Sequence, residues 1–170
     1  MGNYLNPGME NFQKMVNSEI YVDKTGLIRY TNSVINTMQG YLCVSRPRRF
    51  GKSMAAAMLA AYYSRGCDSE QLFESFEIAK NSSFHKYRNH YDVIFLNMQE
   101  FLSQSKNMGE MTGLIQKSVL WELLAEYPNF RYFDSSNLAR TMQDIYAYTS
   151  RPFVLIIDEW DCIFREYKTD

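Results

Sequence analysis

The chain has 170 residues, of which 46% are hydrophobic, and its formal net charge is −1. This length and apolar content predict one globular domain with a substantial core. The near-balance of charge argues against a general polyanion binder, although it leaves room for a local basic patch.

The cysteines and the first residues indicate a cytoplasmic protein. Cys43, Cys67 and Cys162 are far apart and form no CxxC pair. This usage favours reduced thiols over a disulfide framework or a zinc site. The chain start lacks the charged and apolar regions of an export signal, and no membrane span is visible. We therefore expect a cytoplasmic protein with no membrane partner.

The first half of the chain predicts three helices and one strand. A short helix is expected over residues 9–19, then an extended run, then an amphipathic helix over 24–38 that Asp23 could cap. The apolar run "GYLCVS" (residues 40–45) predicts a buried strand. Alanine, methionine and leucine dominate residues 51–66, which predicts a helix that Gly66 can end.

The second half of the chain also predicts strands that alternate with helices. Branched and aromatic residues predict a strand over residues 91–98, and a second apolar strand is expected over 153–157. Between them, residues 111–127 form the clearest amphipathic pattern, and residues 135–150 predict a further helix with Ser136 as its cap. Strands that are apolar on both faces and alternate with helices indicate an α/β fold, with a largely parallel sheet and flanking helices.

The stretch "SRPRRFGKS" (residues 45–53) ends like a phosphate-binding loop. Gly51 would allow close approach of the backbone, Lys52 would reach the outer phosphates, and the Ser53 hydroxyl would bind magnesium. Arg46 stands where the usual pattern has its first glycine, and Pro47 removes an N–H donor. Arg48 and Arg49 could compensate with charge-assisted bonds to phosphate. The loop alone leaves two hypotheses open, a nucleotide site and a basic surface turn.

A second motif, "FVLIIDE" (residues 153–159), favours the nucleotide site. Enzymes with such loops hold magnesium with an acid at the end of an apolar strand, and Asp158 stands there. Glu159 follows directly and could polarise a water for attack on the γ-phosphate. A buried strand that merely ends in two acids is common, but its occurrence in order with Gly-Lys-Ser is much less so. The pair also favours hydrolysis over phosphoryl transfer to a metabolite.

Four segments resemble the AAA-ATPase-like family of bacterial proteins: "YVDKTGLI", "SRPRRFGKS", "IFLNM" and "VLIIDEWD". In that family, an arginine in place of the first loop glycine is the rule. The ATPase region is often followed by a PD-(D/E)XK nuclease-like domain, through which nucleic acid would become a partner. The resemblance covers about residues 9–161 and implies ATP and Mg²⁺ as ligands.

Carried over by position, the resemblance implies three sets of site residues. Glu159 would be catalytic, and Ser53 with Asp158 would hold the metal. Asp161 matches a further acid of the family, and Asp23 and Lys24 match its "DK" hallmark, with roles that stay open. The nucleotide-binding set would be Arg46, Arg48, Arg49, Phe50, Gly51, Lys52 and Ser53.

The resemblance also implies an organisation. We expect an N-terminal helical extension over residues 1–39 and, over 40–170, the portion of an AAA-type P-loop NTPase-like core from Walker A to Walker B. The chain would be truncated just after the second motif. In the AAA strand order, a missing strand would lie between the loop strand and residues 153–157. We therefore expect an incomplete sheet and a tendency to self-associate.

Three functions remain to be distinguished. The first is a Mg-dependent ATP-binding domain that hydrolyses ATP in the complete protein, with weak or no turnover in this chain. The second is a nucleotide-binding switch with little turnover. The third is a basic nucleic-acid-binding module built on "RPRR", which the near-zero net charge disfavours.

Overall fold

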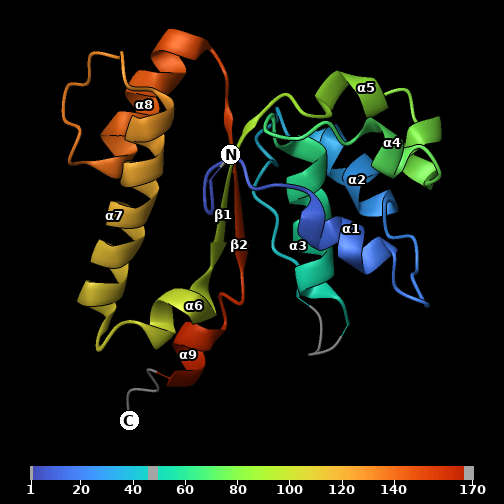
Figure 1. Cartoon of the computed structure of the whole chain (residues 1–170), viewed down its shortest axis with the longest axis horizontal. Coiled ribbons are helices and arrows are strands. Elements are labelled where there is room, and N and C mark those ends of the chain that lie inside the picture. Colours follow the sequence, from blue (N-terminus) through green and yellow to red (C-terminus); the bar gives the residue numbers. More distant parts are fainter. Residues whose placement is uncertain (1, 46–49, 167–170) are drawn as a thin grey trace.

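Two parallel strands, β1 (Asp92–Asn97) and β2 (Phe153–Asp158), lie at the centre of the molecule with helices on both sides (Figure 1). The structure is a computed structural model and describes residues 2–45 and 50–166. The sequence-based prediction of a mixed α/β fold is therefore confirmed. The helical elements are α1 (Glu10–Val16), α2 (Gly26–Val34), α3 (Lys52–Tyr63), α4 (Glu70–Phe73), η1 (Glu77–Lys80), α5 (Phe84–Tyr87), α6 (Met98–Ser103), α7 (Met108–Glu126), α8 (Leu138–Thr149) and α9 (Cys162–Glu166).

The two strands run in register over their whole length. Asp92 lies opposite Phe153 at one end, and Asn97 lies opposite Asp158 at the other. Parallel neighbours need a long crossover, and helices α6, α7 and α8 supply it. The carboxyl ends of both strands consequently meet at the same edge of the sheet.

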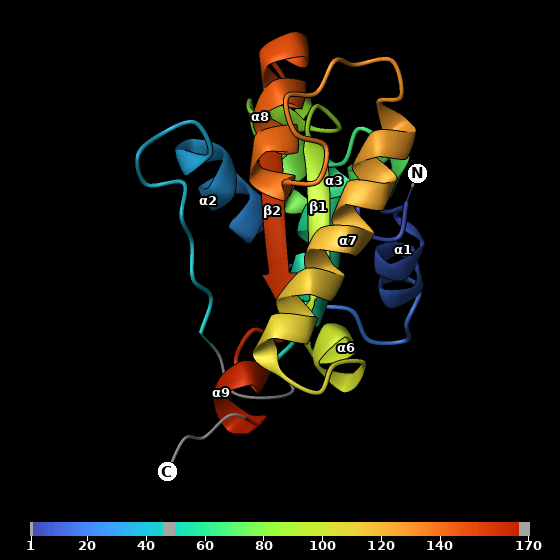
Figure 2. The same ribbon diagram turned by 90° about the vertical axis from the view of Figure 1, so that its left-hand side faces the viewer.

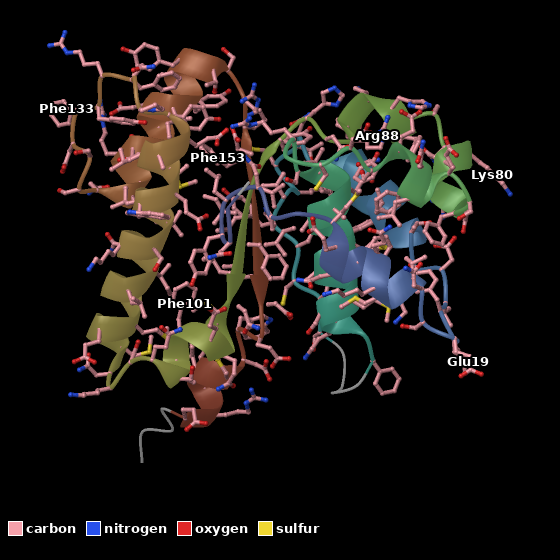
Figure 3. All side chains as sticks on the ribbon, viewed as in Figure 1. Glu19, Lys80, Arg88, Phe101, Phe133 and Phe153 are labelled. Carbon is pink, nitrogen blue, oxygen red and sulfur yellow. The ribbon has the colours of Figure 1, made fainter. Side chains whose placement is uncertain are left out.

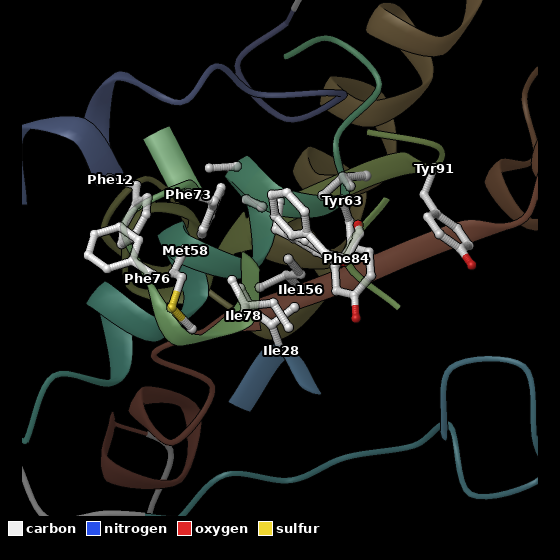
Figure 4. Packing of buried hydrophobic residues seen from close by; sticks show 14 residues of the cluster. Phe12, Ile28, Met58, Tyr63, Phe73, Phe76, Ile78, Phe84, Tyr91 and Ile156 are labelled. Carbon is white, nitrogen blue, oxygen red and sulfur yellow. Dashed lines mark hydrogen bonds between the residues drawn. The ribbon is translucent and has the colours of Figure 1, made fainter. Parts of the chain in front are cut away.

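One face of the sheet is covered by α3, around which α1, α2, η1 and the short helices gather. Alanine and methionine give α3 a slim surface that packs against β2, and Met58 and Ile156 belong to the same buried cluster (Figure 4). Phe12 of α1 stacks on Phe73 of α4 with ring centroids 5.2 Å apart. This aromatic cluster fixes α3 against the sheet and thereby fixes the position of its first residues.

On the other face, α6, α7 and α8 cover β1, whereas Leu155 and Ile157 of β2 stay largely exposed. Figure 3 shows Phe101 and Phe153 on this side of the sheet and Arg88 among the short helices on the opposite side. Helix α7 has 19 residues and buries Met111, Val119 and Leu123, as its amphipathic pattern predicts. Within the described residues, no helix combines the length and the apolar character that crossing a bilayer requires.

The two edges of the sheet differ. The chain start covers the β1 edge, where Asn6 N donates to Val93 O at 2.7 Å and Phe95 N donates to Tyr4 O at 2.8 Å. Glu122 of α7 holds this segment, because its carboxylate accepts the N–H groups of Asn3, Tyr4 and Leu5. The β2 edge has no strand partner among the described residues.

The expectation of a buried strand over residues 40–45 is wrong. This segment forms no ladder, and Tyr41 is 97% exposed. In Figure 2 it descends as a thin trace on the β2 side of the sheet, opposite β1. Its apolar residues satisfy the local pattern of a strand, but among the described residues the segment pairs with no strand, and residues 41–45 are exposed.

The predicted cap Ser136 and the predicted stop Gly66 are both wrong, and the predicted end of the helix after Asp23 lies too far along the chain. Helix α8 is capped by Asn137, whose side chain accepts from Arg140 N at 3.0 Å, and not by Ser136. Helix α3 ends at Tyr63 with Ser64 extended, before Gly66 is reached. Helix α2 ends at Val34, four residues short of the predicted end.

Candidate functional site

The turn into α3 has the backbone shape that the loop hypothesis requires. Gly51 has φ 75° and ψ 32°, a left-handed conformation that glycine adopts without the strain of a Cβ. Lys52 is then the first helical residue, and among the described residues no side chain caps the helix. The first amides of α3 therefore form a positive helix end to which no described side chain supplies an acceptor.

Two of the sequence-predicted loop residues are well placed around this end. Ser53 is exposed on the first turn of α3, and Lys52 is partly exposed beside it. The Phe50 side chain is 63% exposed, so it offers an apolar surface rather than a packed anchor. Arg46, Arg48 and Arg49 lie outside the described residues.

The second motif lies at the carboxyl end of β2. Asp158 is the last strand residue and is 7% exposed. One of its carboxylate oxygens accepts the N–H of Glu159 at 3.0 Å. Glu159 itself has φ 54°, which turns the chain sharply from β2 towards α9.

The Glu159 side chain has a cationic neighbour that sequence reasoning missed. Arg165 of α9 lies 3.6 Å from the Glu159 carboxylate and 3.4 Å from that of Asp161. The spacing of four residues between Asp161 and Arg165 on a helix was a signal for the second pair. Nothing in the sequence pattern indicated the first, because it depends on the turn at Glu159.

The loop end of α3 and the acidic end of β2 lie at the same edge of the sheet. Helix α3 begins there and runs back along the sheet, and both strands point towards it (Figure 1). The packing of α3 against β2 holds the two elements together. The structure thus brings Gly51, Lys52 and Ser53 to the end of the molecule where Asp158 and Glu159 lie.

Asp23 and Lys24, the "DK" pair of the sequence, make different contacts. Asp23 accepts the N–H of Thr25 at 2.7 Å and that of Glu77 at 2.9 Å. Burial alone would raise the pKa of Asp23, but these amide bonds from Glu77 and Thr25 hold it below its usual value. Asp23 thus steadies the chain ahead of α2, whereas Lys24 donates from Nζ to the carbonyl oxygen of Phe50 at 3.1 Å.

Two hollows in the surface lie away from the turn into α3 and from the acidic end of β2. One, of about 220 Å³, is lined by Thr25, Arg29 and Glu77 among others. The other, of about 650 Å³, lies between the chain start and α7. Neither is lined by Gly51, Lys52, Ser53, Asp158 or Glu159. In the described part of the chain, no group of three or more His, Cys, Asp or Glu residues could hold a metal ion.

Comparison with known proteins indicates a family. A family model described as "Predicted AAA-ATPase" matches residues 6–169, almost the whole chain. No curated protein and no solved structure matches significantly.

Proposed function

Because the chain belongs to the predicted AAA-ATPase family, we propose that it is a Mg-dependent ATP-binding domain that hydrolyses ATP in the complete protein. The observation that carries the proposal is the left-handed turn at Gly51, which opens an uncapped helix at the edge where Asp158 ends β2. The turn offers backbone N–H groups and a positive helix end to phosphates, and the strand supplies an acid.

Each residue has a role in this proposal. Lys52 reaches the β- and γ-phosphates, and the first amides of α3 bind phosphate oxygens. Glu159 orients and polarises the attacking water. Arg46, Arg48, Arg49 and Phe50 complete the nucleotide-binding set, and the arginines bring charge to the phosphates.

Magnesium fits the available donor groups. Asp158 offers a carboxylate and Ser53 an exposed hydroxyl, both of them oxygen donors of the kind that Mg²⁺ prefers. The ion usually takes only one or two protein ligands and completes its shell with water and substrate phosphates. Held by Ser53 and Asp158, the ion would supply positive charge against the negative charge that develops during phosphoryl transfer.

Titration calorimetry with Mg²⁺ and a slowly hydrolysed ATP analogue tests the proposal. We expect binding by the unchanged chain and its loss in Lys52→Ala. Lys117→Ala is the matched control, since Lys117 is exposed on α7, outside the proposed set. Absence of binding by a chain shown to be folded, or equal binding by Lys52→Ala, would overturn the proposal.

A nucleotide-binding switch is a second candidate, and the Glu159–Arg165 pair favours it. A carboxylate that pairs with a guanidinium 3.6 Å away is less available to polarise water. Under this hypothesis, Arg165→Gln raises turnover and leaves affinity unchanged. Equal phosphate release by the unchanged chain and the variant would argue against a switch held by this pair.

A further inference from the structure

The chain that leads into α2 is fixed to η1 by the residues on both sides of Lys24. Asp23 accepts the N–H of Glu77 at 2.9 Å, and the Thr25 hydroxyl accepts the N–H of Ile78 at 3.2 Å. Lys24 lies between these two anchors, and its side chain extends to the turn that opens α3.

Lys24 reaches the turn that opens α3. Its Nζ donates to Phe50 O at 3.1 Å. A Cβ added to Gly51 would lie only 2.5 Å from the same Nζ. Glycine at position 51 thus serves two purposes, since it permits the φ of 75° and leaves room for the ammonium group.

This contact determines how one peptide unit is oriented. The peptide bond is planar and trans, so the Phe50 carbonyl and the Gly51 N–H point in opposite directions. A bond that holds the carbonyl towards Lys24 consequently holds the Gly51 N–H on the opposite side. Phosphate-binding loops depend on backbone N–H groups that are directed inward at the ligand.

The ammonium group is also free of described anionic partners. No carboxylate among residues 2–45 and 50–166 forms an ion pair with Lys24. An ammonium has three N–H donors, and the bond to Phe50 uses one. Its positive charge thus adds to that of the α3 end and is not neutralised by an acid.

We propose that Lys24 is a positioning residue of the phosphate site, which holds the Phe50–Gly51 peptide so that the Gly51 N–H is presented to a phosphate oxygen. This inference rests on the proposed nucleotide-binding function. The two residues of the "DK" pair then have different roles. Asp23 anchors the chain before α2 to η1, and Lys24 orients the peptide that follows Phe50, 26 residues further along the chain.

The test compares Lys24→Met, which keeps the stem and removes the donor, with Lys24→Arg, which keeps a donor and the charge. We expect Lys24→Met to lower affinity for the Mg-bound ATP analogue about tenfold, the effect of one charge-assisted hydrogen bond. Lys24→Arg should restore most of it. Lys117→Met is the matched control and should bind as the unchanged chain does.

A second readout separates positioning from general damage. The Gly51 backbone amide resonance, measured without nucleotide, should move in Lys24→Met and stay near its original position in Lys24→Arg, while both variants keep the melting temperature of the unchanged chain. An unmoved Gly51 resonance in Lys24→Met would overturn the inference. A Lys24→Met variant too unstable to study leaves Lys24→Gln, whose shorter amide should also displace the resonance.

The outcomes distinguish this inference from the function on which it rests. If Lys52→Ala loses binding while Lys24→Met binds like the unchanged chain, the nucleotide site stands and the role of Lys24 is refuted. If the unchanged, folded chain binds no nucleotide, both the site and the phosphate role of Lys24 are refuted.

Discussion

The Glu159 carboxylate lies 3.6 Å from the Arg165 guanidinium, just beyond the strand that Asp158 ends. About a third of each of these two side chains is exposed, so the pair adds little to stability. Its significance lies in position, because it holds the proposed catalytic carboxylate at the edge of the sheet where α3 begins.

The first prediction separates binding from chemistry. Glu159→Gln removes the negative charge and keeps the shape, so nucleotide should bind with nearly unchanged affinity. Turnover in the complete protein should fall by roughly 10²–10⁴-fold, the usual contribution of a general base. Calorimetry measures the first quantity and phosphate release the second. Full turnover by the glutamine variant would remove Glu159 from the mechanism.

The second prediction concerns the turn at Gly51. Gly51→Ala places a Cβ in a left-handed conformation with φ 75° and against Lys24 Nζ. The unfolding free energy should fall by about 1–3 kcal/mol, and nucleotide binding should be lost. Denaturant titration checks the first effect.

Gly113→Ala is the control, because it should change the unfolding free energy in the opposite direction. Gly113 lies inside α7, and an added Cβ would meet no atom within 4 Å. Alanine in a helix interior should stabilise the protein by about 0.5–1 kcal/mol. Destabilisation by both substitutions would show that the Gly51 effect is not specific to its conformation.

The third prediction concerns how the free energy of unfolding depends on pH through Asp92, the first residue of β1. Asp92 is fully buried, and its carboxylate accepts bonds from Tyr127 Oη and Asn6 Nδ2 and pairs with Arg65 at 2.6 Å. Burial alone would raise the pKa of Asp92, but Tyr127, Asn6 and Arg65 hold it below its usual value of 3.8. Asp92→Ala should lower stability at neutral pH by about 1–3 kcal/mol, because Tyr127 Oη and Asn6 Nδ2 lose their buried acceptor, while Arg65 keeps its pair with Glu126.

The sign of the dependence follows from the direction of the pKa shift. A carboxyl group whose pKa is lower in the folded state contributes stability above its unfolded pKa, near 3.8. This contribution is lost as pH falls through the lower folded pKa. Denaturant titrations between neutral pH and pH 2 should therefore show the gap between the unchanged chain and Asp92→Ala narrowing below pH 3.8. The exposed Glu74→Ala should show no such gap.

Sequence patterns predicted elements whose evidence is local. The composition of α3, the period of α7 and the apolar run of β2 each lie within one segment, and each element was found. Residues 40–45 failed because a strand is defined by its neighbour, and an apolar run carries no information on whether that neighbour is present. The Lys24–Phe50 contact joins residues 26 apart, so only the packing of α2 against α3 could reveal it.

The final prediction concerns the open edge of β2. Leu155 is 54% exposed and Ile157 is 44% exposed, although an apolar parallel strand is usually covered on both faces. An edge of this kind presents unpaired backbone groups beside apolar side chains and promotes pairing between molecules. We expect the chain to self-associate with rising concentration in sedimentation velocity, and Leu155→Lys to reduce this association. Trp121→Lys is the matched control, because Trp121 is 73% exposed on α7, away from this edge. An unchanged chain that stays monomeric, or equal effects of the two substitutions, would contradict a role for the β2 edge.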